Sequence, residues 1–443
     1  MRHPMRHPRK VTAALAGLTL ALTACGSGDT GGTAATAAPS GVRLPNLAGQ
    51  SVEVAAVWSG AEQASFTEVL RAFEARTGAT TRYTSTGDDI ATVLGTRVKG
   101  GAPPDVAILP QPGLLNQLAG QGNLKPVGSD AATGVAANFA PIWQTLGSVD
   151  GKLYGVWFKA ANKSTVWYRT TAFAQAGVTE PASWDAFVQT AQTIADSGTT
   201  PVSVGGADGW TLTDWFENVY LRTAGADSYD KLARHQIPWT DQSVKTALST
   251  LAAVWGKKGL LVPGASQTDF PTSVTQVFSA NPKGAIVYEG DFVAGVISSD
   301  TPAKVGTDAK FFNFPSVDAS PPSVVGGGDV AVAMRDTAGA QALLTFLASP
   351  EAAAIWAKRG GFTSANKNLP LSTYPDDTSR KIAQALVNAG DAFRFDMSDL
   401  APAAFGGTPG KGEWKLLQDF LTNPADVNGT AQKLEAAAAA AFR

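Results

Sequence analysis

The stretch VEVAAVWSGAEQASFTEVLRAFEARTGATTRYT, residues 52–84, carries one complete strand–helix–strand pattern. Residues 52–57 and 80–84 are predicted to form strands, with a helix between them. The apolar residues that recur at helical spacing and mark one face of that helix are Phe66, Val69, Leu70 and Phe73. Gly78 is predicted to end the helix.

The pattern continues further along the chain. Residues 88–99 are predicted to form a helix that ends at Gly100 and Gly101, and residues 105–109 a third strand. Strands and helices that alternate with short connections predict βαβ units, in which helices cover the faces of a parallel sheet. Ligands of such open sheets bind beyond the carboxyl ends of the strands, so the loops at those ends are the informative ones.

A second series of the same kind follows the middle of the chain. Ser183 is predicted to cap a helix. The further predicted elements are a strand at 201–204, helices around 212–219 and 244–255, strands at 285–288 and 329–334, and helices at 337–359, 378–388, 414–421 and 427–442. The roughly 390 residues beyond residue 50 are too many for one small core, so the sequence predicts an α/β fold of two lobes.

The first residues predict export and a lipid anchor. Residues 1–10 are basic and contain no acid, and residues 11–22 are mostly apolar. Such an order is typical of a secretory signal peptide, predicted here over residues 1–24. The last residues before and including Cys25, LTAC, resemble the bacterial lipobox, whose cysteine carries diacylglycerol after cleavage. Cys25 is the only cysteine of the chain, so it lacks a disulfide partner; the alternative is an ordinary secretory signal with a chance cysteine.

Composition limits the partners. Residues 25–50 are rich in Gly, Ser, Thr, Ala and Pro, which predicts a flexible tether. Cleavage before Cys25 removes four of the 35 basic residues and no acid, which leaves 31 basic residues against 37 acids. This mild acidity argues against nucleic acid as a partner. Since no apolar run beyond residue 24 is long enough to span a bilayer, the membrane is expected to be contacted through the lipid anchor only.

Few residues are available for metal or nucleophilic chemistry. His235 is the one histidine beyond the signal peptide, so a transition-metal site is not expected, whereas calcium held by oxygen ligands stays open. A G-x-S-x-G elbow is missing from the sequence. The glycines at 326–328 precede a predicted strand rather than a helix, which is the wrong order for a phosphate loop. No cofactor is expected.

Aromatic residues stand beside acids in four stretches that we interpret as loops, 58–62, 210–215, 288–292 and 393–399. Sugar rings offer apolar faces to flat aromatics and hydroxyls to carboxylates, and ligand pockets gather a few polar groups among aromatics. The four stretches therefore favour a carbohydrate site. They also leave glycoside hydrolysis open, with Glu289 and Asp291, or Asp396 and Asp399, as paired carboxylates.

Seven segments carry a family resemblance over nearly the whole chain beyond the tether. They are WSGAE at 58–62, GGAPPDVAILPQPG at 100–113, YGVWFKAANKSTVWY at 154–168, YEGDFV at 288–293, GGGDVAVAM at 326–334, GGFTSANK at 360–367 and FRFDMSDLAP at 393–402. In their order and spacing they resemble extracellular solute-binding protein family 1, the sugar-binding lipoproteins of ABC importers, and in particular the α-glucoside (maltose, trehalose, sucrose) branch. Trp157 departs from the family, where a proline is common at that place.

The resemblance implies a type II periplasmic-binding-protein-like fold, with a ligand cleft between two α/β lobes joined by crossing segments near 160–165, 285–290 and 328–332. It implies residues 51–163 and 286–330 for lobe 1, and 164–285 and 331–443 for lobe 2. The ligand-binding residues that it implies are Trp58, Glu62, Asp89, Gln111, Lys159, Asn162, Ser164, Trp210, Asp214, Glu289, Asp291, Asp329, Phe362, Arg394 and Asp396. The aromatic residues predicted to pack in the core instead are Trp167, Tyr168, Trp184, Trp215 and Trp255.

We therefore expect a monomeric, non-enzymatic lipoprotein on the outer face of the cell membrane. It is expected to capture a di- or oligosaccharide, an α-glucoside by resemblance, through closure of its lobes and to deliver it to ABC permease subunits. The first alternative is the same fold binding another solute, such as an amino sugar, a polyol, a glycerophosphodiester or a peptide. The others are a secreted glycoside hydrolase and a structural or adhesive lipoprotein.

Overall fold

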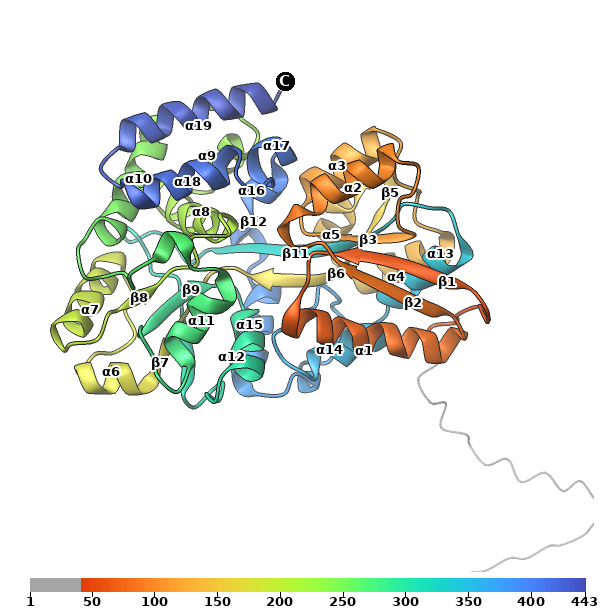
Figure 1. Ribbon diagram of the computed structural model, residues 1–443, viewed down its shortest axis with the longest axis horizontal. Helices are drawn as coiled ribbons and strands as arrows, with labels where there is room; N and C mark the ends of the chain where they lie inside the picture. The colour runs from red at the N-terminus through yellow and green to blue at the C-terminus, as the bar shows by residue number, and fades with distance from the viewer. Residues whose placement is uncertain (1–40) are drawn as a thin grey trace, which may run out of the picture. The chain divides into compact units, whose positions relative to one another are not determined.

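The computed structural model describes residues 41–443. The stretch at 52–84 supplies the first two strands of its first sheet (Figure 1). The strands of this sheet, in chain order, are β1 (Ser51–Ala56), β2 (Thr80–Ser85), β3 (Val106–Leu109), β6 (Gly155–Asn162), β11 (Val324–Ala333) and β12 (Phe393–Phe395). β1 pairs in parallel with β2 and β3, but β11 runs antiparallel to β3 and β6. The sheet is therefore mixed, where strand–helix alternation predicted a parallel one, because a strand from far along the chain joins it.

Helix α1 (Gly60–Thr77) forms where its apolar spacing predicts it. Phe66 and Phe73 are fully buried, and Gly78 follows the last turn in the left-handed conformation at φ 75°. The further helices of this part are α2 (Ile90–Lys99), α3 (Pro112–Gly120), α4 (Ser129–Asn138), α5 (Pro141–Leu146), α13 (Ala338–Leu347) and α14 (Pro350–Ala357). These helices and the first sheet share one apolar core, and we call them the first lobe.

A second sheet holds strands in the order β10-β7-β9-β8. Their bounds are β7 (Thr165–Arg169), β8 (Val202–Ser203), β9 (Ile286–Glu289) and β10 (Ala309–Asn313). Successive residues of β7 point to opposite faces, as strand geometry requires: Val166 and Tyr168 pack in one apolar cluster and Trp167 in another. Helices cover both faces, so β7, β8 and β9 are mostly buried on both sides, whereas the edge strand β10 exposes Lys310 and Asn313.

The helices that pack with the second sheet complete the second lobe. They are α6 (Thr170–Ala176), α7 (Trp184–Asp196), α8 (Trp210–Ala224), α9 (Ala226–Ala233), α10 (Gln242–Trp255), α11 (Phe270–Phe278), α12 (Val293–Asp300), α16 (Met397–Leu400), α17 (Ala403–Gly406), α18 (Gly412–Thr422) and α19 (Val427–Ala441). Ser183 caps α7 as predicted, its Oγ accepting from the backbone N–H of Ala186 at 3.3 Å. The five aromatic residues predicted for the core are all buried there. The chain thus has the predicted architecture of two α/β lobes.

The chain passes between the lobes at places that differ in part from those predicted. β6 leads directly into β7 through Lys163 and Ser164, as expected (Figure 1). Near residue 290, however, β9 stays in the second sheet, and the chain returns to the first only between β10 and β11. A third passage follows α15 (Asp377–Asn388), because Leu386 packs in the first core and Met397 in the second.

The predicted lobe bounds are corrected accordingly. β9, α12 and β10 lie with the second lobe, although residues 286–330 were assigned to lobe 1. α13 and α14 pack in the first core, although residues 331–443 were assigned to lobe 2. Helices of both lobes carry similar apolar faces, so the sequence pattern does not say which sheet a helix covers. The other predicted bounds stay predictions.

The end of the predicted tether is part of the first lobe. Leu47 is 2% exposed, and its backbone N–H donates to the carbonyl of Thr77 at 2.7 Å. Arg76 donates to the carbonyl of Val42 at 2.5 Å. Residues 41–50 therefore pack against α1 instead of forming a tether. The predicted signal peptide, Cys25 and the rest of the tether, up to residue 40, lie outside the described residues.

Within residues 41–443, no helix combines the length and the apolar character needed to cross a bilayer.

Candidate functional site

A buried lysine stands where the first sheet meets the second lobe. Lys159 lies on β6, and its side chain is 4% exposed. Its Nζ is 2.5 Å from Oε1 of Glu62 on α1 and 3.8 Å from Oδ2 of Asp329 on β11. All three residues were predicted to bind ligand, and the fold brings them together from three elements.

Three aromatic rings surround the same ammonium group. Nζ of Lys159 is 5.8 Å from the ring centre of Trp58, 5.5 Å from that of Trp356 and 5.3 Å from that of Phe292. These distances suit cation–π attraction. We call Lys159, Glu62, Asp329 and these three aromatic residues the Lys159 cluster. Because Phe292 follows β9 while the others belong to the first lobe, the cluster contains side chains from both lobes.

The charges of this cluster are set by burial and by their partners. Burial lowers the pKa of Lys159, but Glu62 and Asp329 outweigh it and hold the pKa above its ordinary value. Burial raises the pKa of Asp329 to about 6, against the opposite effects of Lys159 and of a hydrogen bond from the Trp58 indole. Near neutral pH the cluster is therefore a lysine ammonium beside carboxylate acceptors and flat rings, which is chemistry that binds hydroxyl groups.

Asp291 adds an acceptor next to the cluster. Its backbone N–H donates to the carbonyl of Asn162 at 3.0 Å, and its Oδ2 accepts a hydrogen bond from the Thr363 hydroxyl. Its other oxygen, Oδ1, is buried and has no partner among the described residues. Burial raises its pKa to about 6, although Thr363 and Lys159 act in the opposite direction.

A second lysine, which sequence reasoning missed, holds three other acids. Lys163 lies in the passage from β6 to β7, and its Nζ is 2.5 Å from Asp396, 3.1 Å from Asp214 and 3.4 Å from Asp399. Glu289 and Glu217 lie in the same buried region of the second lobe. We call Lys163 and these five acids the Lys163 network.

Burial governs the protonation of this network. It raises the pKa of Asp214, Glu217 and Glu289 well above their ordinary values. Burial and the neighbouring Asp396 raise the pKa of Asp399 to about 8. For Asp396 burial acts in the same direction, but Lys163 and hydrogen bonds from neighbouring groups outweigh it and lower the pKa. The network is thus a largely neutral polar core around one ion pair.

The Lys163 network fastens elements of the second lobe to the passage between the lobes. Glu217 on α8 accepts from the backbone N–H groups of Met397 and Ser398, at 2.6 and 2.8 Å. Asp214 and Asp396, both predicted ligand residues, are fully buried within it. One oxygen of each carboxyl group contacts Lys163, and Oδ2 of Asp214 is buried without a hydrogen-bond partner among the described residues; ligand binding by the two acids stays a prediction.

The predicted loop at 210–215 is the first part of α8. Trp210 begins this helix, and its indole donates a hydrogen bond to Asp88 of the first lobe. Its ring centre lies 5.4 Å from that of Phe270 and 5.9 Å from that of Phe292. Asp89, which was predicted to bind ligand, is the neighbour of Asp88 in the turn Gly87–Asp89, and its role stays a prediction. Trp210 therefore reaches from the second lobe toward the first.

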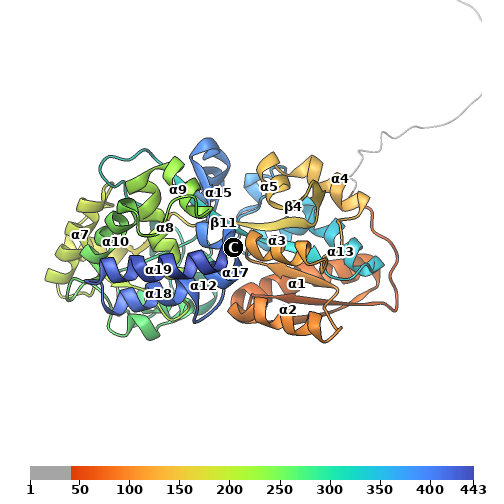
Figure 2. The same cartoon turned by 90° about the horizontal axis from the view of Figure 1, so that it is seen from above.

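The lobes also touch through α3. Nε2 of Gln111 donates to the carbonyl of Gly406 at 3.3 Å, and a Cβ added at Gly113 would run into the carbonyl oxygen of Ala401. Figure 2 shows α3 and α17 meeting between the lobes. Gln111 was predicted to bind ligand; here its amide contacts the backbone of the other lobe.

Four other predicted residues have partners within the protein. Oδ1 of Asn162 accepts from the backbone N–H of Ser164 at 3.0 Å, and the Ser164 hydroxyl donates to Asn218 at 2.6 Å. The ring centre of Phe362 lies 5.2 Å from that of Trp356, in the first core. Arg394 pairs with Asp230 on α9 at 2.8 Å. Ligand binding by these four residues stays a prediction.

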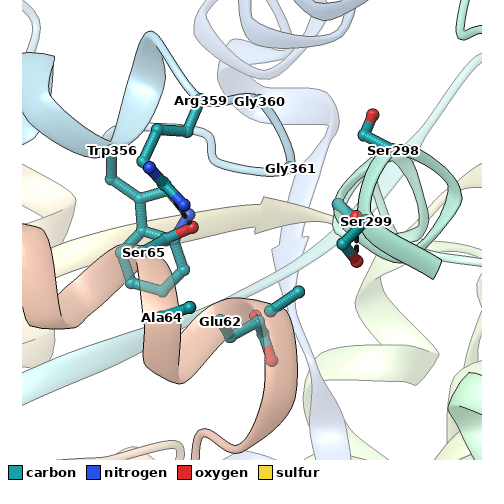
Figure 3. Close-up of a pocket in the computed structure, with 11 residues that line it drawn as sticks. Glu62, Ala64, Ser65, Ser298, Ser299, Trp356, Arg359, Gly360 and Gly361 are labelled. Carbon is teal, nitrogen blue, oxygen red and sulfur yellow. Dashed lines mark hydrogen bonds between the residues drawn. The ribbon is translucent and has the colours of Figure 1, made fainter.

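A pocket of about 360 Å³ adjoins the Lys159 cluster, between α1, α12 and the end of α14 (Figure 3). Glu62 and Trp356 belong both to the cluster and to the wall of this pocket. Arg359, Ser298 and Ser299 supply further polar groups. Figure 3 shows the two serines on the opposite wall from Trp356 and Arg359.

Lys163 and Trp356 were not predicted as site residues, and they differ in how clearly the sequence pattern around them indicates a site. Lys163 stands four residues after Lys159 in a segment that is otherwise mostly apolar, and two lysines there could have been taken as a sign of buried partners. Trp356, by contrast, falls on an apolar helical stripe that is typical of a core residue. Among residues 41–443, no group of His, Cys, Asp and Glu is arranged to hold a metal ion.

Known proteins resemble this chain over most of its length. The family model of bacterial extracellular solute-binding proteins matches residues 58–354. The chain is 33% identical over 384 residues to the osmoprotective compounds-binding protein GgtB of Synechocystis sp., and the aligned region covers 84% of this chain and 89% of that protein. The chain is 32% identical over 407 residues to the alpha-glucosides-binding periplasmic protein AglE of Rhizobium meliloti. That aligned region covers 88% of this chain and 87% of AglE.

Solved structures agree on the fold, which is of the predicted type II periplasmic-binding-protein kind. The solute receptor AcbH superposes with a TM-score of 0.78 at 22% identity and covers 89% of this chain and all of that one. The raffinose complex of RafE superposes with a TM-score of 0.74 at 18% identity, with the same coverage.

Proposed function

The chain belongs to the family of bacterial extracellular solute-binding proteins of ABC importers, and on that premise we propose that it captures an α-glucoside in the cleft between its lobes. The observation that carries the proposal is the Lys159 cluster. Trp58 and Glu62 of the first lobe and Phe292 of the second meet around one ammonium group. Flat rings and acceptors supplied by both lobes suit a neutral, hydroxyl-rich ring molecule.

The α-glucoside preference rests on two supports. The relative AglE is named as a binder of α-glucosides, and Asp291 offers a buried oxygen without a partner among the described residues. A buried acceptor without a partner is costly, so a ligand hydroxyl that donates to it gains affinity. The relative GgtB is named for osmoprotective compounds, so hydroxylated osmolytes belong in the same test.

Closure of the lobes follows from where the contacts lie. A sugar that touches both lobes only when they are closed favours that state by its difference in affinity for the two states. The contacts of Trp210 with Asp88 and of Gln111 with Gly406 are those that opening would break.

Binding without bond cleavage is supported by the placement of the paired carboxylates. Asp396 and Asp399 both contact Lys163, at 2.5 and 3.4 Å, so each carboxyl group already has a lysine partner inside the second lobe. Glu289 lies in the same network. A retaining or inverting glycosidase needs two carboxyl groups that flank the scissile bond.

We also propose that Cys25 carries a lipid that holds the protein on the outer face of the membrane, where it delivers the sugar to permease subunits. The support is the sequence LTAC after an apolar run. A Cys25→Ser variant is expected to be released into the medium instead of staying with the membrane fraction. Retention of the variant on membranes would contradict the anchor.

Titration calorimetry tests the sugar proposal. The panel holds methyl α-D-glucopyranoside, maltose, trehalose, sucrose and glucosylglycerol, with a tripeptide as a control. Binding of at least one glucoside, and no heat with the tripeptide, is expected. Heat with the tripeptide and none with any member of the panel would contradict the proposal. An aryl α-glucoside incubated with the protein should release no phenol.

A further inference from the structure

We propose that Thr363 is a positioning residue for the ligand, which holds the carboxylate of Asp291 so that its free oxygen, Oδ1, accepts from a hydroxyl of the bound sugar. The inference rests on the proposed function and adds to it a residue that was not among the predicted ligand-binding residues.

Backbone contacts with β6 place both residues. The N–H of Asp291 donates to the carbonyl of Asn162 at 3.0 Å, and the carbonyl of Thr363 accepts from the N–H of Ala160 at 2.8 Å. Asp291 follows β9 of the second lobe, whereas Thr363 follows Phe362, which packs in the first core. Two contacts two residues apart on one strand therefore bring together side chains that come from different lobes.

Two glycines let the segment that carries Thr363 come close to α12. Gly361 has a φ of 65°, and a Cβ added there would lie 2.5 Å from Cα of Gly295 on α12. A larger residue at Gly361 would therefore push the segment away from α12. On the other side of Thr363, the N–H of Ser364 donates to the hydroxyl of Tyr374 at 3.1 Å. The backbone is thus held on both sides of Thr363.

The contact between the two side chains is buried and uses one carboxylate oxygen. Thr363 and Asp291 are each 3% exposed. The Thr363 hydroxyl donates to Oδ2 of Asp291, while Oδ1 is buried without a partner among the described residues. A threonine hydroxyl has one hydrogen to donate, so this bond determines which oxygen stays available. An unpaired buried acceptor is costly, and a ligand hydroxyl that donates to Oδ1 removes that cost.

Asp291 stands beside the Lys159 cluster. Each of Lys159 and Asp291 influences the pKa of the other through its charge. Phe292, the next residue in the chain, has its ring centre 5.3 Å from Nζ of Lys159. A sugar bound at the cluster is therefore within reach of the carboxylate that Thr363 holds.

Thr363 also favours the ionised form of this carboxylate. Burial raises the pKa of Asp291 to about 6, and the hydrogen bond from Thr363 opposes this rise more strongly than Lys159 does. Among the described residues, the other titratable group that faces Asp291 is Tyr374 of the first lobe. As pH falls through about 6, Asp291 gains a proton and becomes a poorer acceptor, so sugar affinity should fall.

Substitution of Thr363 provides the test. Thr363→Val removes the hydroxyl but keeps the shape of the side chain, and Thr363→Ser keeps the hydroxyl. The matched control is Thr77→Val on α1, because Thr77 is also 3% exposed and its hydroxyl donates to the carbonyl of Phe73 at 2.8 Å. Calorimetry with maltose and with trehalose, from pH 5 to pH 8, measures affinity, and urea unfolding measures stability.

Thr363→Val is expected to bind sugar about tenfold more weakly at pH 7. Its affinity should also begin to fall at a higher pH than in the wild type, because the pKa of Asp291 rises when the hydrogen bond is lost. Thr363→Ser should stay within about twofold of the wild type and keep its pH profile. Thr77→Val should lose stability but keep both affinity and pH profile. Asp329 also titrates near pH 6, but its contact is with Lys159, so its effect on the profile is common to all these proteins.

A folded Thr363→Val that keeps the affinity and the pH profile of the wild type would overturn the positioning role and leave the proposed function standing. If Thr363→Val does not fold, Asp291→Asn gives an independent measurement, since its amide does not titrate. It should bind about tenfold more weakly at pH 8 and lose part of the decline toward pH 5; wild-type affinity and profile in this variant would contradict the inference. No binding of any glucoside by the wild type would overturn the proposed function, and this inference with it.

Discussion

An ion pair between Lys159 on β6 and Glu62 on α1 joins these two elements of the first lobe, with Nζ and Oε1 2.5 Å apart. The lysine side chain is 4% exposed and that of the glutamate 29% exposed, so the pair is buried on one side only. A second acid, Asp329, lies 3.8 Å from the same ammonium group. The stability of the first lobe therefore depends on side chains that we propose bind the ligand.

Removing the ammonium group should be costly. Lys159→Met is expected to lower the free energy of unfolding by about 3–5 kcal/mol, because it leaves the buried Asp329 without its cation. Urea unfolding monitored by circular dichroism measures this loss. The control is Lys415→Met, whose ion pair with Asp419 is exposed and should contribute less than about 1 kcal/mol. Equal losses in the two variants would show that burial of the Lys159 pair is unimportant.

Contact between the lobes should depend on Gly113. Gly113→Ala is expected to hold the lobes apart, because its Cβ would run into the carbonyl oxygen of Ala401. Small-angle scattering with saturating sugar should then give a larger radius of gyration than for the wild type, and sugar affinity should fall at least tenfold. Gly120→Ala, on the same helix, adds its Cβ in open space and should behave as the wild type. Unchanged scattering for Gly113→Ala would contradict this role.

Trp210 should matter for binding more than for stability. It is half-buried and contacts both Asp88 and Phe292. Trp210→Ala is expected to weaken sugar binding 10- to 100-fold, about 1.4–2.8 kcal/mol, in calorimetry. Trp255→Ala removes a buried core ring instead and should lower the free energy of unfolding by about 3–5 kcal/mol without changing affinity. The reverse pattern would place Trp210 in the core and not at the ligand.

The Lys163 network should make stability depend on pH. The pKa of Asp399 is raised to about 8, so the folded protein keeps this proton while the unfolded chain loses it near pH 4. Between these values the wild type loses stability relative to Asp399→Asn as pH rises, by at most about 1.4 kcal/mol per pH unit. The two proteins should be similar at pH 4 and differ most above pH 8 in urea unfolding.

Asp377 offers a control of opposite sign. It is exposed, and a hydrogen bond from Arg380 lowers its pKa, so Asp377→Asn should lose a little stability at neutral pH rather than gain it. A difference between Asp399→Asn and the wild type that stays constant from pH 4 to pH 9 would contradict a raised pKa at Asp399.

Local patterns in the sequence determined much of the fold. The spacing of Phe66, Val69 and Phe73 and the stop at Gly78 place α1, and Ser183 places the start of α7. These features depend on residues close in the chain, so they can be read from the sequence alone. The spacing of Leu212 and Trp215 likewise indicated a helix, although the start of α8 at Trp210 was interpreted as a loop.

The candidate site was predictable in part, because local motifs name residues without showing what their side chains face. Trp58, Glu62, Lys159 and Asp329 were named from their motifs, and the fold brings them together. Asp214 and Asp396 were named in the same way, but both are enclosed around Lys163. An acid beside an aromatic residue has the same local pattern whether it faces a cleft or a polar core.

By itself the sequence determined the alternation of strands and helices, two lobes, and most of the residues of the Lys159 cluster, because these follow from local periodicity and from motifs. Only the tertiary structure decided that α13 and α14 cover the first sheet, that Lys163 gathers the acids of the second lobe, and that Phe292 and Trp356 close around Lys159. The physical reason is that burial and charge pairing depend on which segments meet in space. Those contacts join residues that lie tens to hundreds of positions apart.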